Sequence, residues 1–215
     1  MEHTDKYKGC VVIQGPTYEN TLEFIRRCWS GYKLIFSTWE GANLGNFFEE
    51  ETVILSQMPE DKGVLNTNLQ KVSTINGMLH AKKLGWKRAF KWRCDMIYYG
   101  TEFLNRFDND NLNIFAWCHN FGGHVTDYFF EGEIDDILTL YDFEAVGGSF
   151  PEYMITQKLY QSGLNQKVNM VGKQFGYDTD VFWHGNEHRP SIWLSSYKSI
   201  PATYGFNLPK IWPNI

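Results

Sequence analysis

Short apolar runs alternate with helical patterns through the first hundred residues of the chain. Runs rich in β-branched and aromatic residues, each followed by a turn signal, predict strands over residues 10–13, 33–36, 52–55 and 90–98. Residues 17–29 and 66–84 carry apolar side chains at helical spacing, and Gly85 ends the second of these patterns. Strands that alternate with helices in this way predict βαβ units and a largely parallel sheet.

The second half of the chain has a different pattern. Residues 114–117 and 125–131 are typical of strands that need not run parallel to the first set, and residues 134–141 and 151–164 predict helices. From Gly172 onward Gly, Pro and aromatic residues dominate, and we expect little regular structure there. Because no repeat or linker interrupts the pattern, we expect one α/β domain over residues 1–215.

The carboxyl ends of parallel strands meet at one edge of a sheet, which is where open α/β sheets bind their ligands. The segments that follow the predicted strands are Gln14-Gly15, Thr38-Trp39-Glu40, Ser56 and Asp95. Divalent cations bind carboxylate and phosphate oxygens. Asp95 is therefore a candidate ligand for a metal that holds a diphosphate, and the alternative is a structural ion pair with Arg93 or Lys91.

Composition narrows the function classes. The 215-residue chain has a formal net charge of −5 and no basic stripe, which argues against nonspecific binding to nucleic acid or to anionic membranes. Aromatic residues make up 17% of the chain, and both core packing and aromatic platforms for sugars account for that content. The four cysteines form no CxxC pair, so zinc and redox motifs are unsupported. Without a signal-peptide core or an apolar run of about 18 residues, we expect a cytoplasmic protein with no transmembrane segment.

Three further residues are candidates for chemistry. Asp127 precedes Tyr128-Phe129-Phe130, and burial in so apolar a setting would raise its pKa and suit a general base; the alternative is a turn or cap aspartate. Glu152 lies in a predicted first helical turn, where a negative charge is favourable in any case. His184 lies in a Gly- and Pro-containing loop, where it either contacts metal or phosphate or has no such role. Walker, GxGxxG, HExxH and GxSxG motifs are absent from the sequence.

Four segments together resemble the WavE-like family of lipopolysaccharide-synthesis glycosyltransferases. They are VVIQGPTYENTL, LIFSTWEG, NLQKVSTINGMLHAKKLGWKRAFKWRCDM and VTDYFFEGEIDDILTLY, and the resemblance covers about two thirds of the chain in the same order. It implies a GT-A-like fold, a nucleotide-sugar donor and Mn²⁺ or Mg²⁺. The sequence also looks like glycosyltransferase domains of large algal viruses, which implies one module of a longer enzyme.

The resemblance also implies a division of labour along the chain, with a nucleotide-binding half over about residues 9–100 and an acceptor and catalytic half over about 101–215. In the first half it implies a nucleotide-sugar site made by Gln14, Gly15, Pro16, Thr38, Trp39, Glu40, Gln70, Thr74 and Arg93. Asp95 matches the last acid of the DxD metal motif, whose first position is Arg93 here. In the second half His184 matches a metal-binding histidine, Glu152 matches a catalytic base, and Asp127 is its competitor or an acceptor contact.

The function expected from these residues is transfer of a sugar from a nucleotide-diphosphate sugar, most simply a UDP-sugar, to a hydroxyl of a glycan or glycoprotein acceptor. Two alternatives stay open. A sugar nucleotidyltransferase shares the α/β logic but usually carries a Gly-rich basic phosphate loop, which this sequence lacks. A noncatalytic carbohydrate-binding module would use the aromatic residues and bind sugar without nucleotide or metal.

Overall fold

A computed structural model describes residues 8–16, 25–27, 29–42, 44, 52–94, 96–98, 107–114, 117–118, 124–127, 129–144, 149–171 and 191–193. Its strands are β1 (Cys10–Gln14), β2 (Lys33–Trp39), β3 (Thr52–Ser56), β4 (Arg88–Arg93), β5 (Met96–Tyr98), β6 (Leu112–Ile114), β7 (Trp117–Cys118), β8 (His124–Val125), β9 (Phe129–Glu133), β10 (Val168–Met170) and β11 (Ser191–Trp193). Its helices are α2 (Thr67–Lys83), α3 (Ile134–Tyr141) and α4 (Pro151–Gln161), with 3₁₀ turns η2 (Val64–Asn66) and η5 (Leu164–Lys167).

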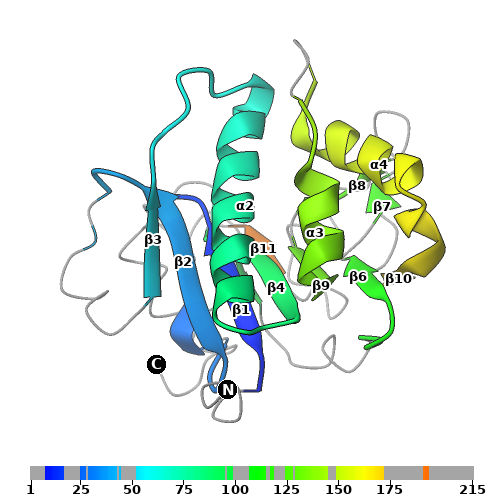
Figure 1. The fold of residues 1–215 in the computed structure, drawn as a ribbon, viewed down its shortest axis with the longest axis horizontal. Coiled ribbons are helices and arrows are strands. Elements are labelled where there is room, and N and C mark those ends of the chain that lie inside the picture. Colours follow the sequence, from blue (N-terminus) through cyan, green and yellow to red (C-terminus); the bar gives the residue numbers. More distant parts are fainter. Residues whose placement is uncertain are drawn as a thin grey trace.

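The seven-stranded central sheet has the order β10-β6-β9-β4-β1-β2-β3. Strands β4, β1, β2 and β3 are mutually parallel, as the alternating pattern predicts. Strand β9 runs antiparallel to both β4 and β6, which makes the sheet mixed. The fold class is therefore α/β with a mostly parallel sheet flanked by helices, compatible with a Rossmann-like arrangement. In Figure 1 the carboxyl ends of β1, β2 and β4 lie at the upper edge of the sheet.

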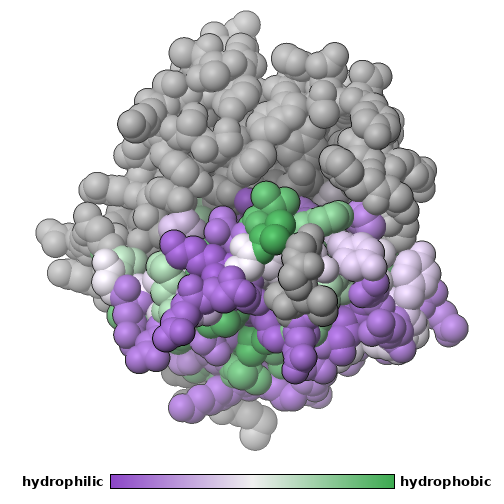
Figure 2. Space-filling view, turned by 90° about the horizontal axis from the view of Figure 1, so that it is seen from above, coloured by the Kyte–Doolittle hydropathy of each residue, from purple (hydrophilic) through white to green (hydrophobic). Residues whose placement is uncertain are grey.

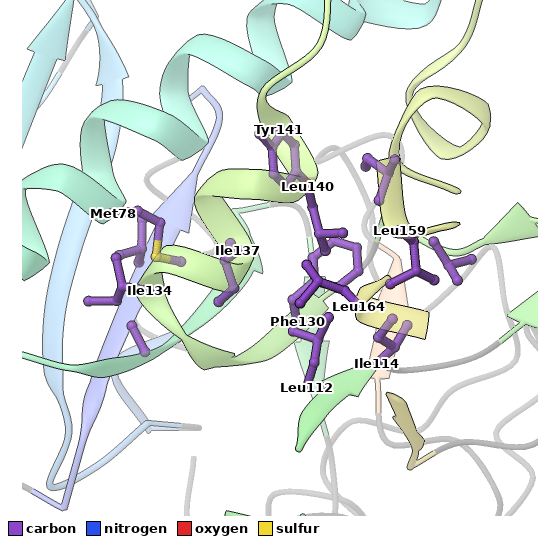
Figure 3. Close-up of a cluster of buried hydrophobic side chains, with 14 of the residues drawn as sticks. Met78, Leu112, Ile114, Phe130, Ile134, Ile137, Leu140, Tyr141, Leu159 and Leu164 are labelled. Atoms are coloured by element: carbon purple, nitrogen blue, oxygen red, sulfur yellow. The ribbon is translucent and has the colours of Figure 1, made fainter. Parts of the chain in front are cut away.

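Helices α2 and α3 lie side by side in front of the sheet (Figure 1). Their inward faces form the main hydrophobic core with the strands behind them, and α4 extends this core (Figure 3). Helix α2 approaches the sheet closely at Gly77, where an added Cβ would lie 2.3 Å from Val12 Cγ1 and 3.0 Å from Ser37 Cβ. Only a residue without a side chain lets the helix lie this near to β1 and β2.

Strand β4 divides its side chains between the two faces of the sheet, as the period of two requires. Phe90 and Trp92 pack against Trp29 on the face opposite α3, with ring centroids 4.8 and 5.2 Å apart. Lys91 lies on the other face, beneath Tyr141 of α3 and beside Phe130 of the neighbouring strand β9. Since β4 is an inner strand covered on both faces, a lysine at this position is buried.

The structure corrects three predicted strands, of which the run 114–117 is divided between the end of β6 and the start of β7 in different sheets. The run 90–98 is not one strand, because β4 ends at Arg93 and β5 pairs antiparallel with β11 in a separate two-stranded sheet. The run 125–131 is likewise divided between β8, which pairs with β7, and β9 in the central sheet. The helix predicted over 151–164 ends at Gln161, whereas the one predicted over 134–141 has those bounds.

Other expectations are met within narrower limits. Cys10 and Cys94 are free and buried, and neither forms a disulfide. Of the helix predicted over 17–29, residues 25–27 are helical and 17–24 lie outside the described residues. Within the part of the chain that the structure describes, no helix combines the length and the apolar character that crossing a membrane requires.

Candidate functional site

The candidate site residues that the structure describes gather at the upper edge of the sheet, where β1, β2 and β4 end and where β9 and α4 begin. Viewed from above, the described part of this edge is mostly hydrophilic, with a few hydrophobic side chains between the polar ones (Figure 2). The prediction that the segments after the parallel strands converge is confirmed for the ends of β1, β2 and β3, whereas Asp95, after β4, lies outside the described residues.

The turn after β1 is fixed by contacts with α2 and with the end of β4. Gln14 is buried, and its Oε1 accepts a hydrogen bond from Ser73 Oγ of α2 at 2.8 Å. Gly15 has φ +114°, and a Cβ there would lie 2.8 Å from Cys94 Sγ at the end of β4. This close approach explains the glycine and brings the β1 turn, which continues into Pro16, beside the β4 end.

The end of β2 forms the neighbouring part of the edge. Thr38 and Trp39 are buried, whereas Glu40 is exposed and its main-chain N–H donates to Ser56 O at 2.9 Å. Across from them, Gln70 and Thr74 lie in the first half of α2. That these side chains border a nucleoside stays a prediction; in this structure Thr38 and Thr74 are fully enclosed by protein.

Arg93 and Asp127 form the central ion pair of the site. Arg93 is the last residue of β4, and Asp127 lies in the bend between β8 and β9. Arg93 Nη1 donates to Asp127 Oδ2 at 2.9 Å, with the carboxylate fully buried and the arginine side chain 16% exposed. Lys91 Nζ donates to the main-chain oxygen of the same aspartate. Two cations from one strand thus hold Asp127 through its side chain and its backbone.

Glu152, in the first turn of α4, is the second carboxyl of the site. Burial, and then the negative charge of Asp127, raise the pKa of Glu152 to about 8. Burial acts on Asp127 in the same direction, but the charges of Arg93 and Lys91, with hydrogen bonds from Glu152 and Arg93, outweigh it and lower the pKa of Asp127. The sequence-based prediction that the pKa of Asp127 is raised is therefore wrong, because it did not include the two cations of β4.

One proton, held between Asp127 and Glu152, explains the hydrogen bonding of both carboxyl groups. Asp127 Oδ1 is buried and has no hydrogen-bond donor among the described residues while Glu152 is ionised. The carboxyl O–H of a protonated Glu152 donates the hydrogen bond that Asp127 accepts. The two carboxyls are thus arranged to share one proton, with the aspartate as the anion.

Hydroxyl groups surround the pair on the side of the helices. Tyr141, at the end of α3, is fully buried, and burial followed by the charge of Asp127 raises its pKa well above the ordinary tyrosine value. Tyr141 Oη and Thr74 Oγ1 are both buried without a hydrogen-bond partner that meets ordinary geometry within the described residues. Buried polar atoms of this kind concentrate where a protein keeps groups for function.

The predicted metal ligands cannot be placed, since Asp95 and His184 both lie outside the described residues. Among the residues that are described, no three His, Cys, Asp or Glu side chains come together as a metal site requires. The expectation of Mn²⁺ or Mg²⁺ therefore stays a prediction, and the groups that the described residues bring together are suited to acid–base and electrostatic chemistry.

Two cavities lined by described residues lie away from the carboxyl pair. One, of about 470 Å³, lies between α2, α4 and the segment that follows α3, and its lining includes Lys71, Phe143 and Gln157. The other, of about 600 Å³, lies at the opposite edge of the sheet beside Tyr32 and Arg88. Neither includes Asp127 or Glu152 among its described lining residues, so the site is assigned from charge and burial rather than from cavity shape.

No protein-family model matches the chain, and no curated protein matches it at a significant level. The resemblance to WavE-like glycosyltransferases therefore stays a prediction from the quoted sequence segments.

Sequence reasoning singled out Arg93, Asp127 and Glu152 separately but missed Lys91 and Tyr141 as members of the same cluster. The signal for Lys91 was present, because a cation between Phe90 and Trp92 on an inner strand must be buried on the opposite face from them. No local signal marks Tyr141, which reads as an ordinary apolar position at the end of an amphipathic helix.

Proposed function

We propose that the protein is a glycosyltransferase that moves a sugar from a nucleotide-diphosphate sugar to a hydroxyl group of a glycan acceptor. The observation that carries the proposal is the carboxyl pair at the ligand-binding edge of an α/β sheet, in which Glu152 has its pKa raised to about 8 and Asp127 is held by Arg93. A carboxyl group with a pKa near the working pH is suited to accept a proton from an acceptor hydroxyl.

In the proposed reaction Glu152 is the general base. The acceptor oxygen forms a bond to the anomeric carbon of the donor, the bond from that carbon to the diphosphate oxygen breaks, and the acceptor proton passes to the Glu152 carboxylate. The nucleoside diphosphate leaves with the electron pair of the broken bond. Asp127 does not contact the acceptor in this scheme, since its side chain is fully buried; its negative charge adds to burial in raising the proton affinity of Glu152.

The arrangement of the edge supports a donor site beside the carboxyl pair. The ends of β1 and β2 carry the residues expected to border the nucleoside; Arg93 pairs with Gln14 in the sheet, and its charge also acts on Glu152. An arginine at this place suits a diphosphate, because its planar group binds phosphate oxygens while retaining its pair with Asp127. The proposal also includes a GT-A-like fold, which is a more specific assignment than the α/β class described above.

Calorimetric titration with UDP, with and without Mn²⁺, followed by a screen of UDP-sugars and other nucleotide sugars for donor hydrolysis, tests the proposal. We expect binding of the nucleoside diphosphate and release of that product from at least one donor. Consumption of a nucleoside triphosphate together with a sugar phosphate would instead indicate a nucleotidyltransferase. Binding of free sugar with no affinity for nucleotide would indicate a carbohydrate-binding module and would refute the enzyme.

A further inference from the structure

The side chain of Lys91 is completely buried in the middle of β4, with 0% exposure. Its Nζ donates to the main-chain oxygen of Asp127 and lies 5.9 Å from the ring centroids of both Phe130 and Tyr141. A buried lysine loses the hydration of its charge, so a protein retains one only where other groups compensate that loss. Here the compensating groups are a carbonyl oxygen, two aromatic faces and the nearby Asp127 carboxylate.

Lys91 and Arg93 act on the same residue from the same face of β4, because they are two positions apart. Arg93 holds the side chain of Asp127, and Lys91 holds its main-chain oxygen. The positive charge of each lowers the pKa of that carboxyl. Since Asp127 lies in a bend between strands rather than within one, its position depends on these contacts.

We infer that Lys91 is a positioning residue that, together with Arg93, holds Asp127 as the anion of the carboxyl pair and so leaves the shared proton on Glu152. The inference rests on the proposed function for its catalytic meaning, namely which carboxyl exchanges a proton with the acceptor. The charged and titratable groups among the described residues that face the pair are Lys91 and Arg93 of β4, Tyr141 of α3 and the two carboxyls themselves.

Carbon-13 labelling of the aspartate and glutamate side chains allows the two carboxyls to be titrated directly by NMR, with D127N and E152Q identifying their signals. In the wild-type protein Asp127 should ionise at a lower pH than Glu152. In K91M, which removes the charge but keeps the length of the side chain, Asp127 should ionise at a higher pH. K91R, which keeps the charge, should restore the wild-type titration in part or in full.

Lys71→Met is the matched control. Lys71 Nζ also donates to a main-chain oxygen, that of Phe143, and lies 5.5 Å from the centroid of that ring, but it does not contact the carboxyl pair. If Lys91 only packed against its aromatic neighbours, K91M and K71M would both alter unfolding, and neither would change the titration of Asp127 or Glu152.

An Asp127 titration that is the same in folded K91M as in the wild type would overturn the inference. So would a wild-type protein in which Glu152 ionises first, a result that needs no variant to fold. Because the titrations require no turnover, they are independent of the donor screen. Shifted titrations without sugar transfer would refute the proposed function alone, and sugar transfer with an unshifted Asp127 would refute the role of Lys91 alone.

Discussion

Two carboxyl groups in contact acquire opposite properties at the site because their neighbours differ. Both are buried, which penalises the charged form of each. Among the neighbouring charges, two cations from β4 act most on Asp127, whereas the charge with the largest effect on Glu152 is the Asp127 anion, which outweighs the opposing effect of Arg93. Burial identifies a carboxyl that is worth attention, and the sign of its neighbours decides whether it holds or releases a proton.

The pH dependence of sugar transfer should follow the ionisation of Glu152. A general base acts only when deprotonated, so kcat/KM should rise with pH and level off above about 8, where the pKa of Glu152 lies. Glu152→Gln should lower kcat about 10²–10⁴-fold and remove this rise. Glu133→Gln changes an exposed acid at the start of α3 and serves as the control. A pH profile of E152Q that matches the wild-type profile would exclude the base role.

Asp127→Asn tests the other half of the pair. The negative charge of Asp127 contributes to the raised pKa of Glu152, so its removal should move the rising limb of the pH profile to lower pH. Rates of donor turnover measured from about pH 5 to about pH 9, a range that extends from the ordinary carboxyl pKa to beyond the raised one, give the midpoint. Asp135→Asn, with a side chain 68% exposed, is the matched control and should leave the midpoint in place. An unmoved midpoint in D127N would show that the two carboxyls are not coupled.

At the scale of single elements, the position of α2 governs how the upper edge is assembled. Its inward face supplies Ser73, which binds Gln14 of β1, and Asn76, whose Nδ2 donates to Ser56 Oγ at the end of β3 at 2.7 Å. One helix thereby links the ends of two strands that are not neighbours in the sheet. The close approach at Gly77 is what brings these polar side chains within reach.

Gly77→Ala should destabilise the protein even though alanine favours helix. The gain in helix propensity is about 1 kcal/mol, but the new Cβ would lie 2.3 Å from Val12 Cγ1 in a buried, β-branched neighbour. Overpacking of this kind costs about 1–3 kcal/mol, so the melting temperature should fall. Leu79→Ala, at a position of α2 that is 49% exposed, should change it much less. A G77A protein that melts above the wild type would show that β1 yields easily.

Local pattern predicted the elements whose environment is uniform along their length. Strands β1 to β3 and helices α2 and α3 were found where apolar spacing placed them, within a few residues at their ends. It failed between β4 and β5 and between β8 and β9, where one continuous strand was predicted but the two strands belong to different sheets. The break after β4 depends on the pairing of β5 with β11, which lies far along the chain, and the break after β8 depends on the pairing of β8 with the nearby strand β7. Neither pairing can be recognised from the run itself.

For the candidate site, too, the sequence predicted the individual residues but not the contacts between them. Arg93, Asp127 and Glu152 each stand out by residue type and position, yet their contacts follow from the register of β4 against β9, which pairs Trp92 with Phe129. That register brings Arg93 beside a residue 34 positions away. Since the direction of a pKa shift depends on such partners, it could not be predicted from the residues themselves.

At the scale of the whole molecule, buried ionisable groups link folding to pH. Arg88 makes a two-point contact with Glu131 across β4 and β9, at 3.1 and 2.9 Å, so this buried acid is neutralised at the opposite edge of the sheet. The upper edge is different, because one of its carboxyls retains a proton in the folded state. The stability of the domain should therefore report on the site directly, without any substrate.

The free energy of unfolding should fall as pH rises from about 4.5 to about 8, between the ordinary pKa of Glu152 and its raised value. In that window the folded protein holds a proton on Glu152 that the unfolded chain has lost, so each added pH unit favours unfolding by at most about 1.4 kcal/mol. Glu152→Gln cannot ionise and should lose this contribution to the slope. Urea unfolding of wild type and E152Q at about pH 5 and about pH 8, near the two ends of that window, measures the difference. Equal changes in the two proteins would mean that Glu152 ionises normally in the fold, and the carboxyl pair would then have no special claim to acid–base chemistry.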